Sequence, residues 1–173
     1  MSRDFRNKPF SIQRINSTGK QIGDYSYPKL FFIENFLRII INSVLSIQIG
    51  PNWWGSAASP NLQKSANRIR IKYQERQALR AGHALPGNHD IYYVYFPNLI
   101  EIIREHAHHF RLVISNIDNL IADVDVVVNG RNLVCHMNYP SEYDKRKITE
   151  LQKTSLSVID EIRKKGIPIL VPL

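Results

Sequence analysis

An arginine, an asparagine and a histidine in the C-terminal part of the chain could together act on a phosphodiester. Arg131, Asn132 and His136 stand in the stretch Gly130-Arg-Asn-Leu-Val-Cys-His136. The arginine fork donates paired hydrogen bonds to a phosphate and stays charged, and histidine takes or gives a proton near neutral pH. In RNA the adjacent 2′-hydroxyl is an internal nucleophile. A histidine base, an arginine that stabilises the oxyanion and an asparagine that orients them would therefore suffice without a metal ion.

The spacing of these three residues leaves two interpretations open. On a helix, Asn132 and His136 share one face, whereas Arg131 lies about 100° round the axis from Asn132. Arginine alone has the reach to converge from there, or a symmetry-related second subunit completes the site with its own motif. The alternative assigns Arg131 to a salt bridge at a helix end and His136 to capping, because this spacing of arginine and histidine is common.

Conflicting local signals precede the motif. Ser115-Asn-Ile-Asp118 resembles a capping box, and apolar residues follow at helical spacing, at Ile117, Leu120, Ile121 and Val124. However, β-branched alternation from Val124 that ends in Asn129-Gly130 favours a hairpin. Arg131 and His136 form a site only if this segment is helical.

Hydrophobic periodicity predicts helices on both sides of this segment. One helix begins at Pro28 and has a broad apolar face that could serve both a core and a dimer interface, formed by Ile33, Phe36, Leu37, Ile40, Ile41, Val44 and Leu45. The last helix begins at Ser141 and is closed by Lys164-Lys165-Gly166, which supply cations and a C-terminal glycine. Residues 1–26 lack sustained periodicity and are predicted to be a basic N-terminal arm, followed by one helical domain over 27–173.

A further helix, from Ser59-Pro60 to about Arg80, carries a basic stripe. The stripe consists of basic residues four positions apart: Lys64, Arg68, Lys72, Arg76 and Arg80. Like charges at this spacing destabilise an isolated helix by about 0.2–0.5 kcal/mol per pair, and a bound RNA backbone would relieve that repulsion. A solvated face and a DNA-binding helix are the alternatives.

A tryptophan pair and a group of three histidines are each assigned a structural role. Trp53 and Trp54 are expected to anchor a loop onto the core rather than to stack on bases. The helix predicted after Pro97 carries His106, His108 and His109, with no acidic or cysteine ligand beside them at a recognised metal-binding spacing. Surface or interface histidines are therefore favoured, and neither a metal ion nor a cofactor is predicted.

The composition is ordinary for a globular protein, but the charge is not. Hydrophobic residues make up 43% and charged residues 22% of the 173 residues, unlike a disordered or fibrous chain. Lys and Arg total 23 against 15 Asp and Glu, a formal net charge of +8 that favours a polyanionic partner. The single cysteine, Cys135, excludes an internal disulfide. Without a signal peptide or an uninterrupted apolar run of about 18 residues, a cytoplasmic protein with no membrane association is expected.

The motif Arg131-Asn132-Leu-Val-Cys-His136 resembles the signature of the HEPN superfamily, in which an arginine, a polar residue, three further residues and a histidine define the active site. Gly50-Pro-Asn-Trp53-Trp54 resembles the Gly-x-x-Trp-Trp ending of the first helix in one HEPN branch, found in surveillance endoribonucleases and bacterial defence proteins. The stretch from Tyr93 to Ile103 is similar to the aromatic lead into that branch's middle helix. Together these motifs cover about Pro28 to Lys165.

The resemblance implies an all-α bundle of four to five helices that dimerises with its motifs facing each other. It implies metal-independent endoribonuclease activity that leaves a 2′,3′-cyclic phosphate, in a toxin or antiviral defence system with a possible antitoxin or regulatory partner. Arg131 would hold the scissile phosphate, His136 act as general acid or base, and Asn132 position them. A non-catalytic HEPN module for RNA binding or dimerisation is the alternative.

Two positions depart from the family pattern. Some HEPN toxins carry a tyrosine two residues after the histidine, which a partner nucleotidyltransferase modifies. Here that position is Asn138, and Tyr139 follows it. The other departure is Gly130, which would weaken a helix directly before the arginine.

Overall fold

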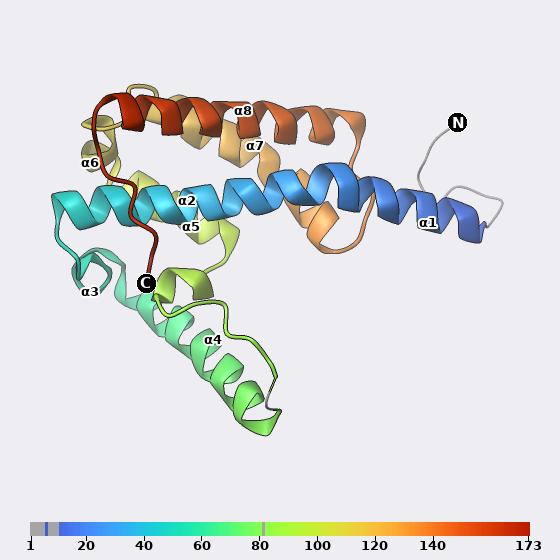
Figure 1. Cartoon of the computed structure of the whole chain (residues 1–173), viewed down its shortest axis with the longest axis horizontal. Helices are drawn as coiled ribbons and strands as arrows, with labels where there is room; N and C mark the ends of the chain where they lie inside the picture. Colours follow the sequence, from blue (N-terminus) through green and yellow to red (C-terminus); the bar gives the residue numbers. More distant parts are fainter. Residues whose placement is uncertain (1–5, 7–10, 81) are drawn as a thin grey trace. The chain divides into compact units, whose positions relative to one another are not determined.

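The computed structural model describes residues 6, 11–80 and 82–173, and in this part of the chain all regular structure is helical (Figure 1). The predicted all-α class is therefore confirmed. In chain order the elements are α1 (Ile12–Gln21), the π-helix η1 (Ile22–Ser26), α2 (Tyr27–Gln48), α3 (Trp53–Ala57), α4 (Pro60–Leu79), the 3₁₀ helix η2 (Asp90–Tyr93), α5 (Phe96–Glu105), α6 (Ala107–Arg111), α7 (Ile117–Cys135) and α8 (Glu142–Lys164).

The chain forms two compact units. Unit 1 consists of the residues up to Asn35 together with Asp118–Asp160, and unit 2 consists of Phe36–Ile117 together with Glu161–Leu173. Helix α2 contributes its first turns to unit 1 and its remainder to unit 2. The two units are described separately below.

The N-terminal segment predicted to be an arm is helical from Ile12 onward. α1 and η1 cover residues 12–26 and continue directly into α2, so the helix does not begin at Pro28. Ser11 caps α1, since its side chain accepts a hydrogen bond from the Arg14 backbone N–H at 3.4 Å. Buried side chains recur every four residues, at Thr18, Ile22, Ser26 and Leu30. Two of these four are polar, which hides the stripe from a hydrophobicity pattern. Residues 1–5 and 7–10 of the predicted arm lie outside the described residues.

α1, η1 and α2 form one continuous helix of 37 residues, Ile12–Gln48. By length and composition alone this helix could cross a membrane, because it contains a long, predominantly apolar stretch. However, 56% of that stretch is buried inside the structure. Such burial is typical of the core helix of a globular protein.

Helix α7 of unit 1 settles the conflict between helix and hairpin. It runs without interruption from Ile117 to Cys135, so the hairpin at Asn129-Gly130 is wrong and the helical expectation is confirmed. Side chains at helical spacing enter the core, namely Leu120, Val124, Val127 and Val134. Burying a valine contributes about 1.5–3 kcal/mol, whereas its helix propensity is less than about 0.7 kcal/mol below that of alanine. Tertiary burial therefore outweighs the local β preference.

Helix α8 begins and ends as the sequence predicts. Ser141 and Asp144 form a reciprocal capping box: the Ser141 Oγ accepts from the Asp144 N–H at 3.1 Å, and the Asp144 Oδ2 accepts from the Ser141 N–H at 2.9 Å. At the other end Gly166 has a φ of 66°, the left-handed conformation of a C-terminal glycine. The apolar face is buried at Ile148, Leu151, Ser155, Val158 and Ile162.

In unit 2, Trp53 is a packing anchor. Its side chain is fully buried, and its Nε1 donates to Asn42 Oδ1 at 3.0 Å. The His89 ring stacks on Trp53 with 5.4 Å between centroids, and Trp54 packs edge-on against Trp53. The prediction that this pair anchors a loop is confirmed for Trp53, because a buried ring offers no surface to a base.

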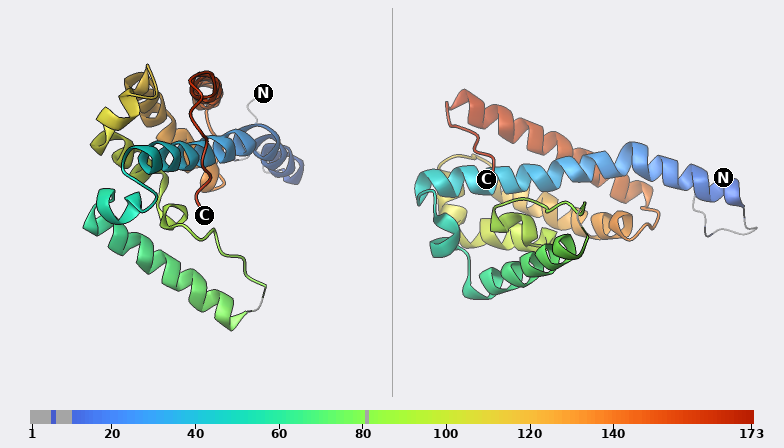
Figure 2. Two further views of the ribbon diagram at one scale, coloured as in Figure 1. Left: turned by 60° about the vertical axis from the view of Figure 1, so that its left-hand side comes forward. Right: turned by 60° about the horizontal axis from the view of Figure 1, so that its bottom comes forward.

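Helix α4 of unit 2 follows the predicted bounds. Ser59 caps it by accepting from the Leu62 N–H at 3.3 Å. Its first turns bury Leu62 and Ala66, whereas every residue from Ile71 to Arg80 is exposed. The segment that follows returns along the helix to η2 (Figures 1 and 2), and Arg70 Nη1 pairs there with Asp90 Oδ1 at 2.7 Å.

The helix predicted after Pro97 is interrupted. It is divided into α5 and α6 at His106, which ends the first helix and precedes the second. The break brings His108 close to its neighbours, with 3.9 Å between the ring centroids of His108 and His109. On an unbroken helix His106 and His109 would share one side and His108 would diverge from them; this expectation is wrong, because the break brings all three rings together.

Candidate active site

The candidate site occupies the C-terminal end of α7, where His136 is the last residue with helical hydrogen bonding. Its backbone N–H donates to the Asn132 carbonyl at 3.0 Å. The next two residues close the helix, since the Met137 N–H donates to Val134 O at 3.0 Å and the Asn138 N–H donates to Leu133 O at 2.7 Å. This is a Schellman motif, and Met137 takes its left-handed position with a φ of 57°. His136 is therefore held at a defined helix end.

Asn132 and His136 lie on one exposed face of α7. They are one helical turn apart, as the hydrogen bond between their backbones requires, and both residues are exposed. Arg131 precedes His136 by five residues and so lies about 140° round the axis from it. Within a single chain the helix therefore presents the asparagine and the histidine together and the arginine on another side.

Arg131 is held by an ion pair, as the alternative interpretation expected, but its partner was not predicted from the sequence. Its Nη2 donates to Glu34 Oε2 on α2 at 3.1 Å, and the two side chains are only 20% and 19% exposed. Its Nη1 lies 3.4 Å from Asn132 Oδ1. Arg131, Asn132 and Glu34 thus form one polar cluster at the edge of the unit 1 core.

A signal for Glu34 was present in the sequence. It is the single acidic residue between Tyr27 and Gln48 and lies within the apolar stripe of that helix. A carboxylate in such a position is rarely buried unless a cation pairs with it. The sequence does not indicate which cation this is, because 97 residues separate Glu34 from Arg131.

Cys135 lies beside the cluster and is not an activated nucleophile. Partial burial of its sulfur raises the pKa of the Cys135 thiol, the nearby Arg131 guanidinium lowers it, and Glu34 raises it, with a net increase. The residue as a whole is exposed. A thiol with a raised pKa is protonated at neutral pH, so the chemistry available at this helix end belongs to Arg131, Asn132 and His136.

Gly130 is explained by a close approach between α7 and α8. The residue is buried, and a Cβ added to it would lie 2.9 Å from Asp144 Cβ. Asp144 is itself the buried member of the capping box that starts α8. Glycine at position 130 therefore allows the segment before Arg131 to pack against α8, which outweighs its poor helix propensity.

Tyr139, on the loop after His136, is engaged within unit 1. Its hydroxyl donates to Gln21 Oε1 at 2.8 Å and accepts a hydrogen bond from Lys145 Nζ. Lys145 Nζ also lies 4.0 Å from the centre of the Tyr139 ring. The loop that follows the motif is thereby fixed to α1 and α8.

The basic stripe lies on α4 of unit 2. Its five residues are all exposed, which fits both a solvated face and a nucleic-acid surface: Lys64, Arg68, Lys72, Arg76 and Arg80. The end of the stripe borders a pocket of about 450 Å³, whose lining includes Tyr73, Arg76 and His83. The guanidinium of Arg76 lies 6.0 Å from the centre of the Tyr73 ring. Cations and an aromatic ring thus occur together here.

The three neighbouring histidines of unit 2 form no metal site with the described residues. His106 Nε2 lies 3.0 Å from the Ala57 carbonyl, and His108 is exposed. In the described part of the chain, no three His, Cys, Asp or Glu side chains are grouped so that they could hold a metal ion.

The fold and the site define an all-helical protein with a paired arginine and an exposed histidine at one helix end. Both features also fit the simpler interpretation, a helix-end salt bridge and a histidine at a helix cap, so geometry alone admits either role. Comparison of the chain with protein-family models, curated proteins and solved structures finds no match. The HEPN resemblance therefore rests on the sequence motifs.

Proposed function

We propose that this protein is a metal-independent endoribonuclease of the HEPN type that acts in a toxin or antiviral defence system as a homodimer. The proposal is supported by the sequence motifs, the helical fold and the net charge of +8. The observation that carries it is the arrangement at the end of α7. There the exposed Asn132 and His136 share one face, and Glu34 fixes the guanidinium of Arg131.

In the proposed reaction two copies of the motif face one scissile phosphate. One His136 removes the proton from the RNA 2′-hydroxyl, and the 2′-oxygen attacks the phosphorus. The bond from phosphorus to the 5′-oxygen breaks, and the His136 of the second copy protonates the departing oxygen. Arg131 stabilises the negative charge that develops on the phosphate, and Asn132 orients the phosphate and the histidine. The products are a 2′,3′-cyclic phosphate and a 5′-hydroxyl.

The geometry of one chain supports the proposal of a second copy. Because Arg131 and His136 project about 140° apart around α7, one chain does not place both against the same phosphate oxygen without a long reach by the arginine. A two-fold axis near the end of α7 would supply the missing group from the other copy. Sedimentation equilibrium should therefore find a dimer, and cleavage should be lost on dilution to the monomer.

The decisive experiment is RNA cleavage by the purified full chain in EDTA. The wild type should cut, whereas Arg131→Ala and His136→Ala should lower the rate by at least about 100-fold, a typical loss for an acid–base or oxyanion group. His108→Ala and Arg163→Ala are matched controls, because both residues are exposed and lie outside the motif. Cleavage that persists in the Arg131→Ala/His136→Ala double variant would disprove the assignment. RNA binding by the wild type without cleavage would instead favour the non-catalytic module.

A further inference from the structure

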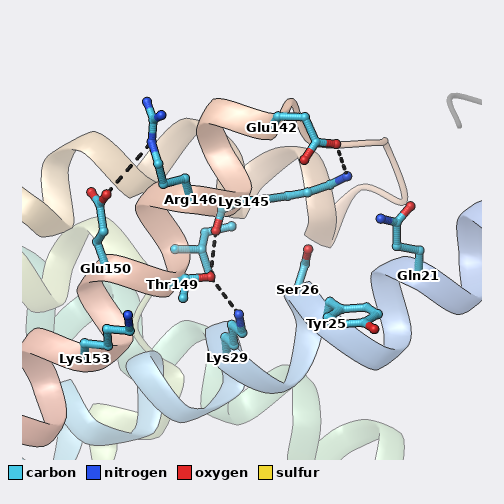
Figure 3. A pocket seen from close by; sticks show the side chains of 11 residues that line it. Gln21, Tyr25, Ser26, Lys29, Glu142, Lys145, Arg146, Thr149, Glu150 and Lys153 are labelled. Atoms are coloured by element: carbon cyan, nitrogen blue, oxygen red, sulfur yellow. Dashed lines mark hydrogen bonds and ion pairs between the residues drawn. The ribbon is translucent and has the colours of Figure 1, made fainter. Parts of the chain in front are cut away.

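Unit 1 contains a basic pocket that is separate from the three residues of the proposed active site. Part of its lining comes from α8, the helix that follows the active-site motif in the chain. Its volume is about 460 Å³, within the range of about 300–1,000 Å³ usual for small-ligand sites. One wall comes from η1 and the start of α2 and the other from α8 (Figure 3). We call it the Lys29 pocket, defined by Tyr25, Lys29, Lys145, Arg146, Thr149 and Lys153.

The charges that line this pocket are unequally neutralised. The lining includes four cations and two carboxylates, Glu142 and Glu150. Glu142 pairs with Lys145 at 2.8 Å. Glu150 pairs with Lys147, which lies outside the lining, at 2.7 Å and with Arg146 of the lining at 3.9 Å. Lys29 and Lys153 are the two lining cations that no described carboxylate pairs with. The pocket therefore retains a net positive charge.

Among the cations of the pocket, Lys29 has the environment that most favours binding of an anion. Its residue is half-buried, and its Nζ donates to the neutral Thr149 Oγ1 at 2.6 Å. Thr149 donates its own proton to the Lys145 carbonyl at 2.9 Å, so its oxygen is free to accept from Lys29. Among the described residues no carboxylate lies within ion-pair distance of Lys29. A partly desolvated ammonium group that faces only a hydroxyl gains most from a bound anion.

Lys145 and Lys153 extend this positive surface along α8. Partial burial lowers the pKa of Lys145, but its hydrogen bonds with Glu142 and Tyr139 outweigh that effect, so the pKa is raised and the group stays charged. Lys153 is exposed and lies on the same wall, one turn beyond Thr149. Figure 3 shows Lys29 between Lys153 and Tyr25.

Tyr25 gives the pocket a surface that a simple anion would not use. Its side chain is 62% exposed and lines the wall formed by η1. An exposed tyrosine beside lysines is the combination with which proteins hold single-stranded nucleic acid, because the ring stacks on an unpaired base while the cations bind its phosphate. A paired base in a duplex has no free face to offer.

The pocket is also connected to the candidate active site. Lys145 binds the hydroxyl of Tyr139, three residues after His136. Three residues of extended chain span at most about 11 Å, so Tyr139 is near the end of α7. A strand seated in the pocket would therefore lie beside the proposed site of cleavage.

We propose that the Lys29 pocket is a subsite for one nucleotide of a single-stranded RNA substrate, with Lys29 and Lys153 on its phosphate and Tyr25 against its base. This inference rests on the proposed function for the identity of the ligand. It assigns to the pocket the role of positioning the strand and gives it no part in the bond cleavage itself.

The test measures binding apart from cleavage, with the full-length His136→Ala variant and a fluorescently labelled single-stranded RNA 12-mer. For single strands the logarithm of the binding constant falls with the logarithm of salt concentration by about 0.7 for each neutralised phosphate. If Lys29 and Lys153 grip one phosphate, Lys29→Gln/Lys153→Gln should lower this slope by about 0.7 and weaken binding roughly tenfold at 50 mM salt. Lys164→Gln, an exposed lysine near the end of α8, is the control and should change neither value.

Further variants and a second probe make the result decisive. Lys153→Gln alone should weaken binding even if the half-buried Lys29 proves necessary for folding, because Lys153 is exposed. Tyr25→Ala should weaken binding of the 12-mer but leave the salt dependence of that binding unchanged. An unchanged salt slope in the double lysine variant would overturn the proposal, as would adenosine monophosphate that binds as tightly as the 12-mer.

Cleavage assays separate this inference from the proposed function. In the active protein the double lysine variant should raise KM about tenfold and leave kcat within twofold, as expected for lost substrate binding. If the protein does not cut RNA but the lysine variants lower the salt slope, the endoribonuclease assignment fails and the subsite stands. If it cuts RNA with a normal KM in these variants, the subsite is wrong and the endoribonuclease assignment stands.

Discussion

Replacement of Gly130 by alanine is expected to destabilise the protein, although alanine is the better helix former. The new Cβ would lie 2.9 Å from Asp144 Cβ and 3.3 Å from Asp144 Oδ1, so α7 or α8 must shift. Overpacking of this kind costs about 1–3 kcal/mol, whereas replacing a helical glycine with alanine contributes about 1 kcal/mol of stability. The net loss is therefore roughly 0–2 kcal/mol.

Gly19 offers a matched control for this prediction. It lies in α1 of the same unit, it is exposed, and an added Cβ would have no neighbour within 4 Å. Gly19→Ala should stabilise the protein by about 1 kcal/mol, so the difference between the two variants isolates the overpacking term of about 1–3 kcal/mol. Urea unfolding followed by circular dichroism measures both free energies. Equal stabilisation by Gly19→Ala and Gly130→Ala would refute the close approach of α7 and α8.

Three further predictions concern stability at the helix ends and at the candidate site. Burial lowers the pKa of His89, and its Nδ1 accepts from the Ile91 N–H at 3.1 Å. The unfolded chain therefore binds a proton first, and stability should be complete above about pH 6.5 and fall as the pH drops below it. Urea titrations at pH 5 and 8 should show this loss in the wild type but not in His89→Asn, which keeps an acceptor for the cap. Met137 has a φ of 57°, so Met137→Gly should raise stability by up to about 1 kcal/mol in thermal unfolding. Gly166→Ala at the equivalent position of α8 should instead lower it. Glu34→Gln removes the carboxylate that pairs with Arg131. Because both side chains are about one-fifth exposed, the expected loss is about 1–3 kcal/mol, less than for a fully buried pair. RNA cleavage should fall with it, and unchanged stability would contradict the role given to the pair.

The elements that the sequence predicted well are those whose signals are local. Ser59 and Ser141 mark helix starts through their own side chains, and Gly166 marks a helix end through its backbone freedom. The start of the long N-terminal helix was not predictable in this way. Its buried stripe includes Thr18 and Ser26, which resemble surface residues until the tertiary packing is known.

Helix α7 shows why local rules were insufficient near the motif. Valine alternation and Asn129-Gly130 are hairpin signals on the scale of a few residues. The burial of five apolar α7 side chains at helical spacing, Ile117, Leu120, Val124, Val127 and Val134, outweighs them. The lack of tertiary information in local rules also explains why Gly130 was interpreted as a residue that weakens the helix. A glycine required by a close contact with Asp144 cannot be distinguished from a weak helix former without the second helix.

The residues of the candidate site also differ in whether local sequence predicts them. Arg131, Asn132 and His136 are adjacent in sequence and were predicted together, whereas Glu34 reaches them only through the fold. Its contribution is nevertheless central to the proposed chemistry. Glu34 binds one Nη of Arg131, and Asn132 lies beside the other, so the guanidinium plane is fixed before any substrate arrives. Preorganised donors stabilise a developing charge without reorganisation during the reaction.

The carboxylate of Glu34 also offsets the positive charge of Arg131 that would attract the phosphate. Under the proposed function, additional cations would be needed to attract the RNA strand, and the Lys29 pocket would supply them within the same unit.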